Sequence, residues 1–219
     1  MPLAPLPKVR AELVAASRKV HANGWVANHD GNLSVKLTGN RLLITATAIS
    51  KGDVDDSKLL IVDLTGKVLE GRRKPFSELE LHLAIYRARP EAEAVIHAHP
   101  VVATAFGLTN SELTPIAMPE VVVSLGDKIP TLPRALPKDE EALKRVSAAA
   151  KLYDAMLISG NGVLTWGTSL EMAFLRMELV EHYAKILAIA KPMGNVAPLS
   201  AAELAKLLEA RKKAGLGPR

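Results

Sequence analysis

The chain contains no cysteine among its 219 residues. This absence excludes a disulfide scaffold, a cysteine nucleophile and a metal site built from thiolates. A bound metal would have to be held by carboxylate, amide or imidazole groups. The chain has six histidines to offer: His21, His29, His82, His97, His99 and His182.

Aromatic residues are also scarce, with two Trp, three Tyr and three Phe. These are too few for a platform that stacks bases, and the net charge of +5 is mild, so we expect no nucleic-acid partner. We expect the basic clusters at 72–74 and 211–213 to be a solvated loop and a solvated tail.

Long apolar runs are missing as well. No stretch approaches the roughly 20 residues that span a bilayer, and the first seven residues lack the charged and apolar regions of a signal peptide. We therefore expect a cytoplasmic protein that does not associate with membranes.

The composition, with 48% hydrophobic and 23% charged residues, is that of a globular protein. We expect one domain over residues 1–219, with a core over about 9–190 and a C-terminal helix over about 200–214. Apolar spacing predicts helices over 9–23, 139–151, 169–190 and 200–214, and a capping box at Ser77 predicts another that Pro90 follows. Strands are predicted at 33–37, 41–47, 59–63, 68–69, 94–99, 121–124, 129–132, 155–159 and 163–166.

Several of these strands follow one another as hairpins, which favours an α/β fold with a mixed, mainly antiparallel sheet. No glycine-rich dinucleotide-binding or P-loop motif follows a strand, so neither of those nucleotide-binding folds is supported.

His97 and His99 are two residues apart on a predicted strand, so their side chains point to one face. Histidine is the commonest metal ligand, and no cysteine competes for the role. The pair is therefore a candidate metal site. A chance coincidence of two histidines remains the alternative.

Glu78 follows Ser77 at the start of a predicted helix. In the simplest interpretation Ser77 caps the helix and Glu78 favours its positive end. In the alternative, the Glu78 carboxylate projects toward the strand of the histidine pair and acts as a general base beside a dication.

Gly31-Asn32 leads into a predicted strand. Turn chemistry explains this pair fully. The functional alternative is a concavity of amide groups that binds an anion, to which the Thr47 hydroxyl would add a donor.

These residues belong to a longer ordered series over about residues 9–190. The series comprises Gly31-Asn32-x-Ser34, Ile44-Thr45-Ala46-Thr47, Val62-Asp63-x-x-Gly66, Val68-x-Glu70-Gly71, Lys74-Pro75-x-Ser77-Glu78 with His82, Arg89-Pro90-x-Ala92, Ala94-Val95-Ile96-His97-x-His99, Gly162-Val163-Leu164-Thr165-x-Gly167 and Leu170-Glu171. Each motif is weak, but the ordered set resembles the class II aldolase/adducin family. That family contains fuculose-phosphate and rhamnulose-phosphate aldolases and ribulose-phosphate 4-epimerase.

The resemblance implies a three-layer α/β/α fold around a mainly antiparallel sheet and a homotetramer with active sites between subunits. It also implies a divalent metal, commonly zinc, held by three histidines. Glu78 falls on the residue that moves the proton, and Asn32, Thr47 and Ser77 fall on phosphate-binding positions. We therefore expect a class II aldolase-like carbon–carbon lyase of carbohydrate metabolism, which acts on a small hydroxycarbonyl compound or ketose phosphate through a metal-bound enediolate.

One position departs from the family pattern, because Asn161 stands where the third metal histidine belongs. An amide oxygen binds zinc less well than imidazole does. Three alternatives follow. The site binds its metal more weakly, it prefers a harder ion such as Mn²⁺ or Mg²⁺, or a histidine from elsewhere in the chain is the third ligand.

We predict His182 as that third ligand. It lies about 13 residues, or roughly 20 Å, into the predicted 169–190 helix. We expect this helix to run back beside the strand at 163–166, so that His182 reaches the level of Asn161. A pairing with Glu178, four residues earlier, is the alternative role for His182. His29 is the other contender for the metal, and His82 would be a supporting group.

Two other functions stay open on this scaffold. An epimerase or a dehydratase can start from the same metal-bound oxygens. The missing histidine also leaves room for a non-enzymatic interaction module like the head domain of adducin, although the retained Glu78, His97 and His99 argue against it.

Overall fold

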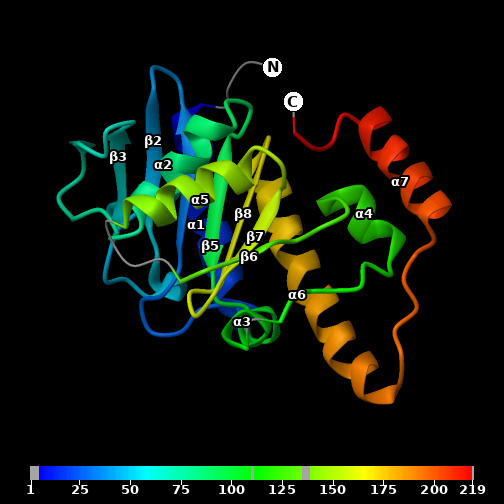
Figure 1. The fold of residues 1–219 in the computed structure, drawn as a ribbon. Coiled ribbons are helices and arrows are strands. Elements are labelled where there is room, and N and C mark those ends of the chain that lie inside the picture. The colour runs from blue at the N-terminus through cyan, green and yellow to red at the C-terminus, as the bar shows by residue number, and fades with distance from the viewer. Residues whose placement is uncertain (1–4, 110, 135–138, 219) are drawn as a thin grey trace.

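The computed structural model describes residues 5–109, 111–134 and 139–218. An eight-stranded sheet runs through it in the order β4-β3-β2-β1-β5-β8-β7-β6 (Figure 1). Its strands are β1 (Asn32–Leu37), β2 (Arg41–Thr45), β3 (Leu59–Asp63), β4 (Val68–Glu70), β5 (Ala94–Ala98), β6 (Thr131–Leu132), β7 (Ala155–Ile158) and β8 (Val163–Gly167). Neighbouring strands are antiparallel except β6 and β7, so the mixed, mainly antiparallel sheet is confirmed.

Helices cover both faces of the sheet. They are α1 (Leu6–Ala22), α2 (Leu79–Ala88), α3 (Val101–Leu108), α4 (Pro119–Leu125), α5 (Glu140–Ala150), α6 (Leu170–Met193) and α7 (Ala201–Lys213), with 3-10 turns at Lys51–Asp53 and Asp56–Lys58. Helix α2 packs on α5, and α1 packs on α6 (Figure 1). No helix within the described ranges is both long enough and apolar enough to cross a membrane.

Two hydrogen bonds show which helix covers which face. Ser34 of β1 contacts His82 of α2, and Thr165 of β8 donates to the Ala173 carbonyl of α6. In the register of the sheet, Ser34 lies level with Trp166, so Thr165 points to the opposite face. The sheet is therefore sandwiched between an α2 layer and an α6 layer.

Strand β5 lies in the middle of the sheet, and all five of its residues are buried. Four of them are the apolar residues of Ala94–Ala98, as expected for a strand covered on both faces. His97 is the polar exception, so the strand places an imidazole inside the core of the molecule.

The predicted strand at 121–124 is wrong, because these residues lie in helix α4. Pro119 sits in the first turn of α4, where its fixed φ favours a helix. Val121, Val122 and Leu125 then bury one side of that helix, and this tertiary burial overrides the strand preference of valine. The neighbouring prediction at 129–132 shortens to the two residues of β6.

The two expectations for the C-terminal helix had different outcomes. Ser200 and Glu203 form a full capping box at the start of α7, which confirms a capped helix there. The solvated tail at 211–213 is wrong for its first residue, because Arg211 is buried against Asp154. A run of basic residues predicts an exposed segment only if none of its side chains pairs with a buried carboxylate, as Arg211 does with Asp154.

Candidate functional site

Glu78 lies at the N-cap of α2, but its side chain makes no capping hydrogen bond. The predicted capping box at Ser77 is therefore wrong, and the carboxylate turns toward the sheet instead. The side-chain amide of Asn32 donates to Oε2 at 3.0 Å, and that of Asn161 donates to Oε1 at 2.6 Å. Strand β1 and the β7–β8 turn thus hold the two oxygens of one carboxylate.

His97 lies beside this carboxylate. Its Nδ1 atom is 3.0 Å from Oε2 of Glu78, at an angle outside the range of a hydrogen bond. Its Nε2 atom is 2.8 Å from the backbone carbonyl oxygen of Asn161. His97 pairs with Asn32 across β5 and β1, so the sheet register itself brings the imidazole and the amide together.

His99 follows the end of β5. Its ring lies 5.1 Å from the ring of His97, centroid to centroid, and its backbone N–H donates to the Trp25 carbonyl. Nδ1 of His99 is 3.9 Å from an oxygen of Asp30. Nε2 of His99 is buried and has no hydrogen-bond partner among the described residues, which leaves one imidazole nitrogen available inside the site.

The neighbouring groups shift the pKa values of Glu78, His97 and His99 in different directions. Burial on its own would raise the pKa of Glu78, but the His97 charge and the hydrogen bonds from Asn161 and Asn32 lower that pKa well below its ordinary range. Burial would lower the pKa of His97, but the Glu78 carboxylate and the Asn161 carbonyl raise it. Burial and the charge of His97 lower the pKa of His99. Glu78 is thus ionised at neutral pH.

Two glycines allow the backbone to close around these side chains. A Cβ at Gly162 would lie 2.3 Å from the Ala98 carbonyl oxygen and 2.4 Å from Cδ2 of His99. A Cβ at Gly31 would lie 2.9 Å from the His97 carbonyl oxygen. Both residues have positive φ values, 68° and 70°, which glycine adopts without strain.

Thr47 and Ser77 lie on two segments that a backbone bridge between Ala46 and Pro75 joins. The Thr47 backbone N–H donates to the Lys74 carbonyl, and Ser77 is exposed just before Glu78. Two of the three predicted phosphate-binding residues therefore lie on adjoining segments, Thr47 just after β2 and Ser77 just before α2.

His182 is not brought to the histidine pair. It lines a surface pocket on α6 with Asn23, Trp25, Glu178, Glu181 and Lys185. Within the described ranges, no three His, Asp or Glu side chains lie close enough together to hold a metal ion. His29, the other contender, is exposed, and its carbonyl accepts a hydrogen bond from Lys51. Asn161 is the residue that lies against Glu78 and His97.

The sequence singled out His82 as a supporting group but not its partners in a buried polar network behind the site. The Ser34 hydroxyl lies 2.7 Å from Nδ1 of His82 and 2.9 Å from the Tyr86 hydroxyl. The i, i+4 spacing of His82 and Tyr86 on α2 was a usable signal, because it puts both on one helix face. Asp30, next to His99, carried no such signal, since it lies in an irregular turn.

The comparisons with known proteins agree with this fold. The profile described as "Class II Aldolase and Adducin N-terminal domain" matches residues 11–188. The chain belongs to this family.

Relatives in the family catalyse different reactions. The chain is 33% identical over 186 residues to the 3-oxo-tetronate 4-phosphate decarboxylase of Pectobacterium atrosepticum, covering 83% of this chain and 84% of that protein. It is also 33% identical over 186 residues to the methylthioribulose-1-phosphate dehydratase of Methylococcus capsulatus, covering 78% and 89%. The crystal structure of L-fuculose-1-phosphate aldolase from Thermus thermophilus superposes with a TM-score of 0.73 at 30% identity, covering 87% of this chain and 100% of that one. A lyase or dehydratase type of reaction is plausible for the chain.

Proposed function

We propose that this protein is a divalent-metal-dependent lyase that forms or cleaves a carbon–carbon bond beside the carbonyl of a small hydroxycarbonyl compound or ketose phosphate. One observation carries the proposal: the Glu78 carboxylate is held between the amides of Asn32 and Asn161, next to His97.

The metal ligands in this proposal are His97 and His99. The buried, unpartnered Nε2 of His99 supports that role, because a metal would satisfy it. As the third metal ligand we propose Asn161 rather than His182, because Asn161 contacts Glu78 and His97. Two imidazoles and one amide oxygen suit zinc less well than three imidazoles, so Mn²⁺ or Mg²⁺ is a proposed alternative to zinc. When bound, such an ion acts as a Lewis acid for negative charge that develops on a substrate oxygen.

Glu78 is the proposed general base. Its carboxylate lies beside the histidine strand, where it can accept a proton from a substrate carbon or hydroxyl group. The amides of Asn32 and Asn161 fix the direction of its lone pairs. General acid–base groups contribute about 10²–10⁴-fold to rate.

The phosphate of the substrate would bind near Asn32, Thr47 and Ser77. Asn32 uses one amide N–H on Glu78, and its second N–H remains for a substrate oxygen. The exposed basic residues at 72–74 precede Ser77 and add positive charge at this end of α2. We also propose a homotetramer in the cytoplasm, as the family resemblance suggests.

A dehydratase is the second candidate, because the dehydratase of Methylococcus capsulatus is as similar in sequence as the decarboxylase of Pectobacterium atrosepticum. Product analysis by NMR separates the possibilities. The protein, loaded with Zn²⁺ or Mn²⁺, is incubated with L-fuculose 1-phosphate, methylthioribulose 1-phosphate and 3-oxo-tetronate 4-phosphate. Two smaller products support the lyase, whereas loss of water or inversion of a stereocentre without cleavage rejects it.

The variant Glu78→Gln tests the base. We expect turnover to fall by about 10²–10⁴-fold with the metal content unchanged. Glu80→Gln is the matched control, because Glu80 lies on the same helix and pairs with Arg87 instead. Unchanged turnover in Glu78→Gln would overturn the assignment of Glu78 as the base.

A further inference from the structure

The two histidines of the candidate site are held in different ways. His97 lies within β5, where pairing with Asn32 of β1 and Leu164 of β8 fixes its backbone. His99 lies just beyond Ala98, the last residue of β5, so the pairing of the strands does not reach it. The position of the His99 imidazole therefore depends on contacts outside the sheet.

One of these contacts comes from the segment that follows α1. The Trp25 carbonyl accepts the backbone N–H of His99 at 2.7 Å. Trp25 is buried, and its ring lies 5.2 Å from the ring of Phe174 on α6, centroid to centroid. The backbone of His99 is thus held, through Trp25, against helix α6.

A second link to α6 lies at the start of α3, which packs on α6 (Figure 1). Helix α3 begins at Val101, and its N-cap residue, Pro100, makes no side-chain capping bond. Glu181 of α6 takes that role, since its Oε1 accepts the N–H of Val102 at 3.3 Å and its Oε2 accepts that of Ala103 at 2.9 Å. A carboxylate from another helix therefore caps α3.

The Glu181 side chain is buried, with 3% of its residue surface exposed. Burial of a carboxylate is costly unless hydrogen bonds or an opposite charge compensate for it. Its two N–H partners belong to the positive end of α3, and Nζ of Lys185, one turn along α6, lies 3.4 Å from Oε1. A movement of α3 against α6 would therefore deprive a buried carboxylate of its hydrogen bonds.

The capped end of α3 is close to His99 along the chain. Only Pro100 and Val101 separate His99 from Val102. Proline restricts its own φ, which is −57° here, so this short link has little freedom to absorb a movement of α3. A displacement of the start of α3 would thus reach the backbone of His99.

We propose that Glu181 is a positioning residue of the candidate site, which fixes the place and orientation of His99 through the start of α3. Its hydrogen bonds go to backbone groups of α3, so it acts through His99 and not on a substrate. For the metal, the inference rests on the proposed function, in which His99 is a ligand. Mutation of a group that orients a metal-binding histidine typically lowers metal affinity by about 10–100-fold.

The variant Glu181→Gln tests the inference, because it keeps the shape of the side chain but replaces one acceptor oxygen with an amide group that donates. One of the two bonds to α3 is then lost. Glu181→Asp is a second variant, which keeps the charge but is one methylene too short to reach both N–H groups. The same changes are expected in it, so it decides the question if Glu181→Gln does not fold.

Glu178→Gln is the matched control. Glu178 lies on α6 one turn before Glu181 and lines the same surface pocket, but its side chain is exposed. Circular dichroism and urea denaturation establish that each variant is folded under the conditions of the measurements.

The first measurement uses the metal-free protein and does not depend on the proposed function. Labelling with carbon-13 at Cε1 gives one NMR signal for each of the six histidines, and the variant His99→Gln assigns the signal of His99. We expect this signal to shift or broaden in Glu181→Gln and to stay unchanged in Glu178→Gln. A cap that only stabilised α3 would lower the stability without moving the signal in the folded protein. An unchanged His99 signal in folded Glu181→Gln would overturn the proposal.

The second measurement is zinc affinity, by competition with a chromophoric chelator. Glu181→Gln should bind zinc about 10–100-fold more weakly than the wild type, whereas Glu178→Gln should match the wild type. Equal affinities in the wild type and Glu181→Gln would count against the proposal. A wild-type protein that binds no zinc would reject the proposed metal role of His99 instead, and the NMR comparison would then decide on Glu181 by itself.

Discussion

Asn161 contributes to the site through both its side chain and its backbone. The side-chain amide donates to Glu78, and the backbone carbonyl lies 2.8 Å from Nε2 of His97. A histidine at this position could keep the backbone contact but would lose the amide donor. Asn161, which departs from the family pattern, therefore orients Glu78, and in the proposed metal site the same residue would also set the metal affinity.

The variant Asn161→His should bind zinc at least about tenfold more tightly, because imidazole is a better zinc ligand than an amide oxygen. Competition with a chromophoric chelator measures the affinity. His182→Gln is the companion variant and is expected to leave zinc affinity unchanged. A loss of affinity in His182→Gln would instead identify His182 as the third ligand.

His82 is a buried residue whose surroundings change its behaviour with pH. It is fully buried, and desolvation together with the charge of His97 lowers its pKa to about 3. In the unfolded chain an ordinary histidine has a pKa near about 6.5. Between these two values the unfolded state binds more protons than the folded state. The free energy of unfolding should therefore fall as the pH drops from the upper value toward the lower one.

The variant His82→Gln should show a smaller loss of stability between about pH 7 and about pH 5 than the wild type does, since it removes this proton uptake. Urea denaturation at both pH values measures the difference. His21→Gln is the control, because His21 is exposed on α1. If the two variants respond to pH identically, the linkage to His82 is wrong.

At the scale of elements, turns and helix starts determine where the functional groups point. Gly162 in the β7–β8 turn and Gly31 before β1 allow close backbone approach to the histidine strand. Ser77 matches a helix-start signature, yet α2 starts at Leu79 and Glu78 faces the sheet. Local motifs thus located the start of the helix within two residues but did not determine the direction of its first side chains.

The variant Gly162→Ala should destabilise the protein far more than Gly24→Ala. Both glycines have φ near 68°, so the conformational cost of adding a Cβ, about 1–2 kcal/mol, is shared. A Cβ at Gly24 meets nothing within 4 Å, whereas one at Gly162 overlaps the Ala98 carbonyl and the ring of His99. Chemical denaturation of both variants measures the difference, and equal losses would contradict a steric role for Gly162.

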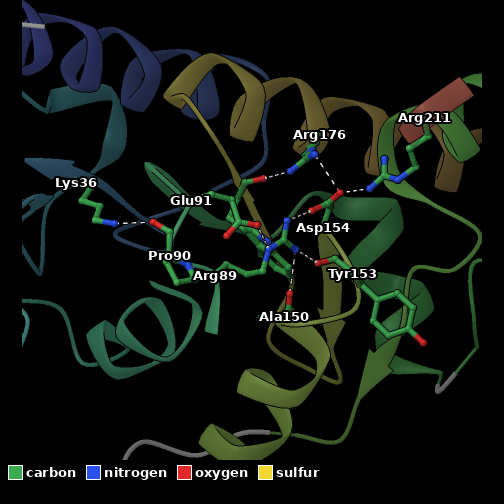
Figure 2. A network of polar contacts seen from close by, with 10 residues as sticks. Lys36, Arg89, Pro90, Glu91, Ala150, Tyr153, Asp154, Arg176 and Arg211 are labelled. Atoms are coloured by element: carbon green, nitrogen blue, oxygen red, sulfur yellow. Dashed lines mark hydrogen bonds and ion pairs between the residues drawn. The ribbon is translucent and has the colours of Figure 1, made fainter. Parts of the chain in front are cut away.

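At the scale of the whole molecule, Asp154 joins parts that are far apart in the sequence. Its partners lie at the end of α2, on α6 and on α7, and α7 also packs against α4 (Figures 1 and 2). The family profile ends at residue 188, before α7 begins. The Arg211 contact therefore attaches the C-terminal helix to the family core.

The variant Asp154→Asn should lower the free energy of unfolding by about 3–5 kcal/mol, because it leaves buried guanidinium groups without their carboxylate. Glu209→Gln is the control, since it breaks an exposed pair with Lys213 on α7 and should change stability little. Thermal and urea denaturation compare the two. A loss in Asp154→Asn no larger than in the control would show that the network does not support the fold.

The sequence by itself determined the absence of thiolate chemistry, the mainly antiparallel sheet and the alternation that puts His97 and His99 on one face. These features depend on composition, on the period of strands and on turn residues, which are local. Only the tertiary structure decided that Val121 and Val122 lie in a helix, that Arg211 is buried, and that Asn161 holds Glu78. Each of these depends on a partner many residues away, and the burial or hydrogen bond that it provides outweighs the local preference. Of the six histidines in the cysteine-free chain, the candidate site contains His97 on β5 and His99 just after this strand, with Asn161 beside His97.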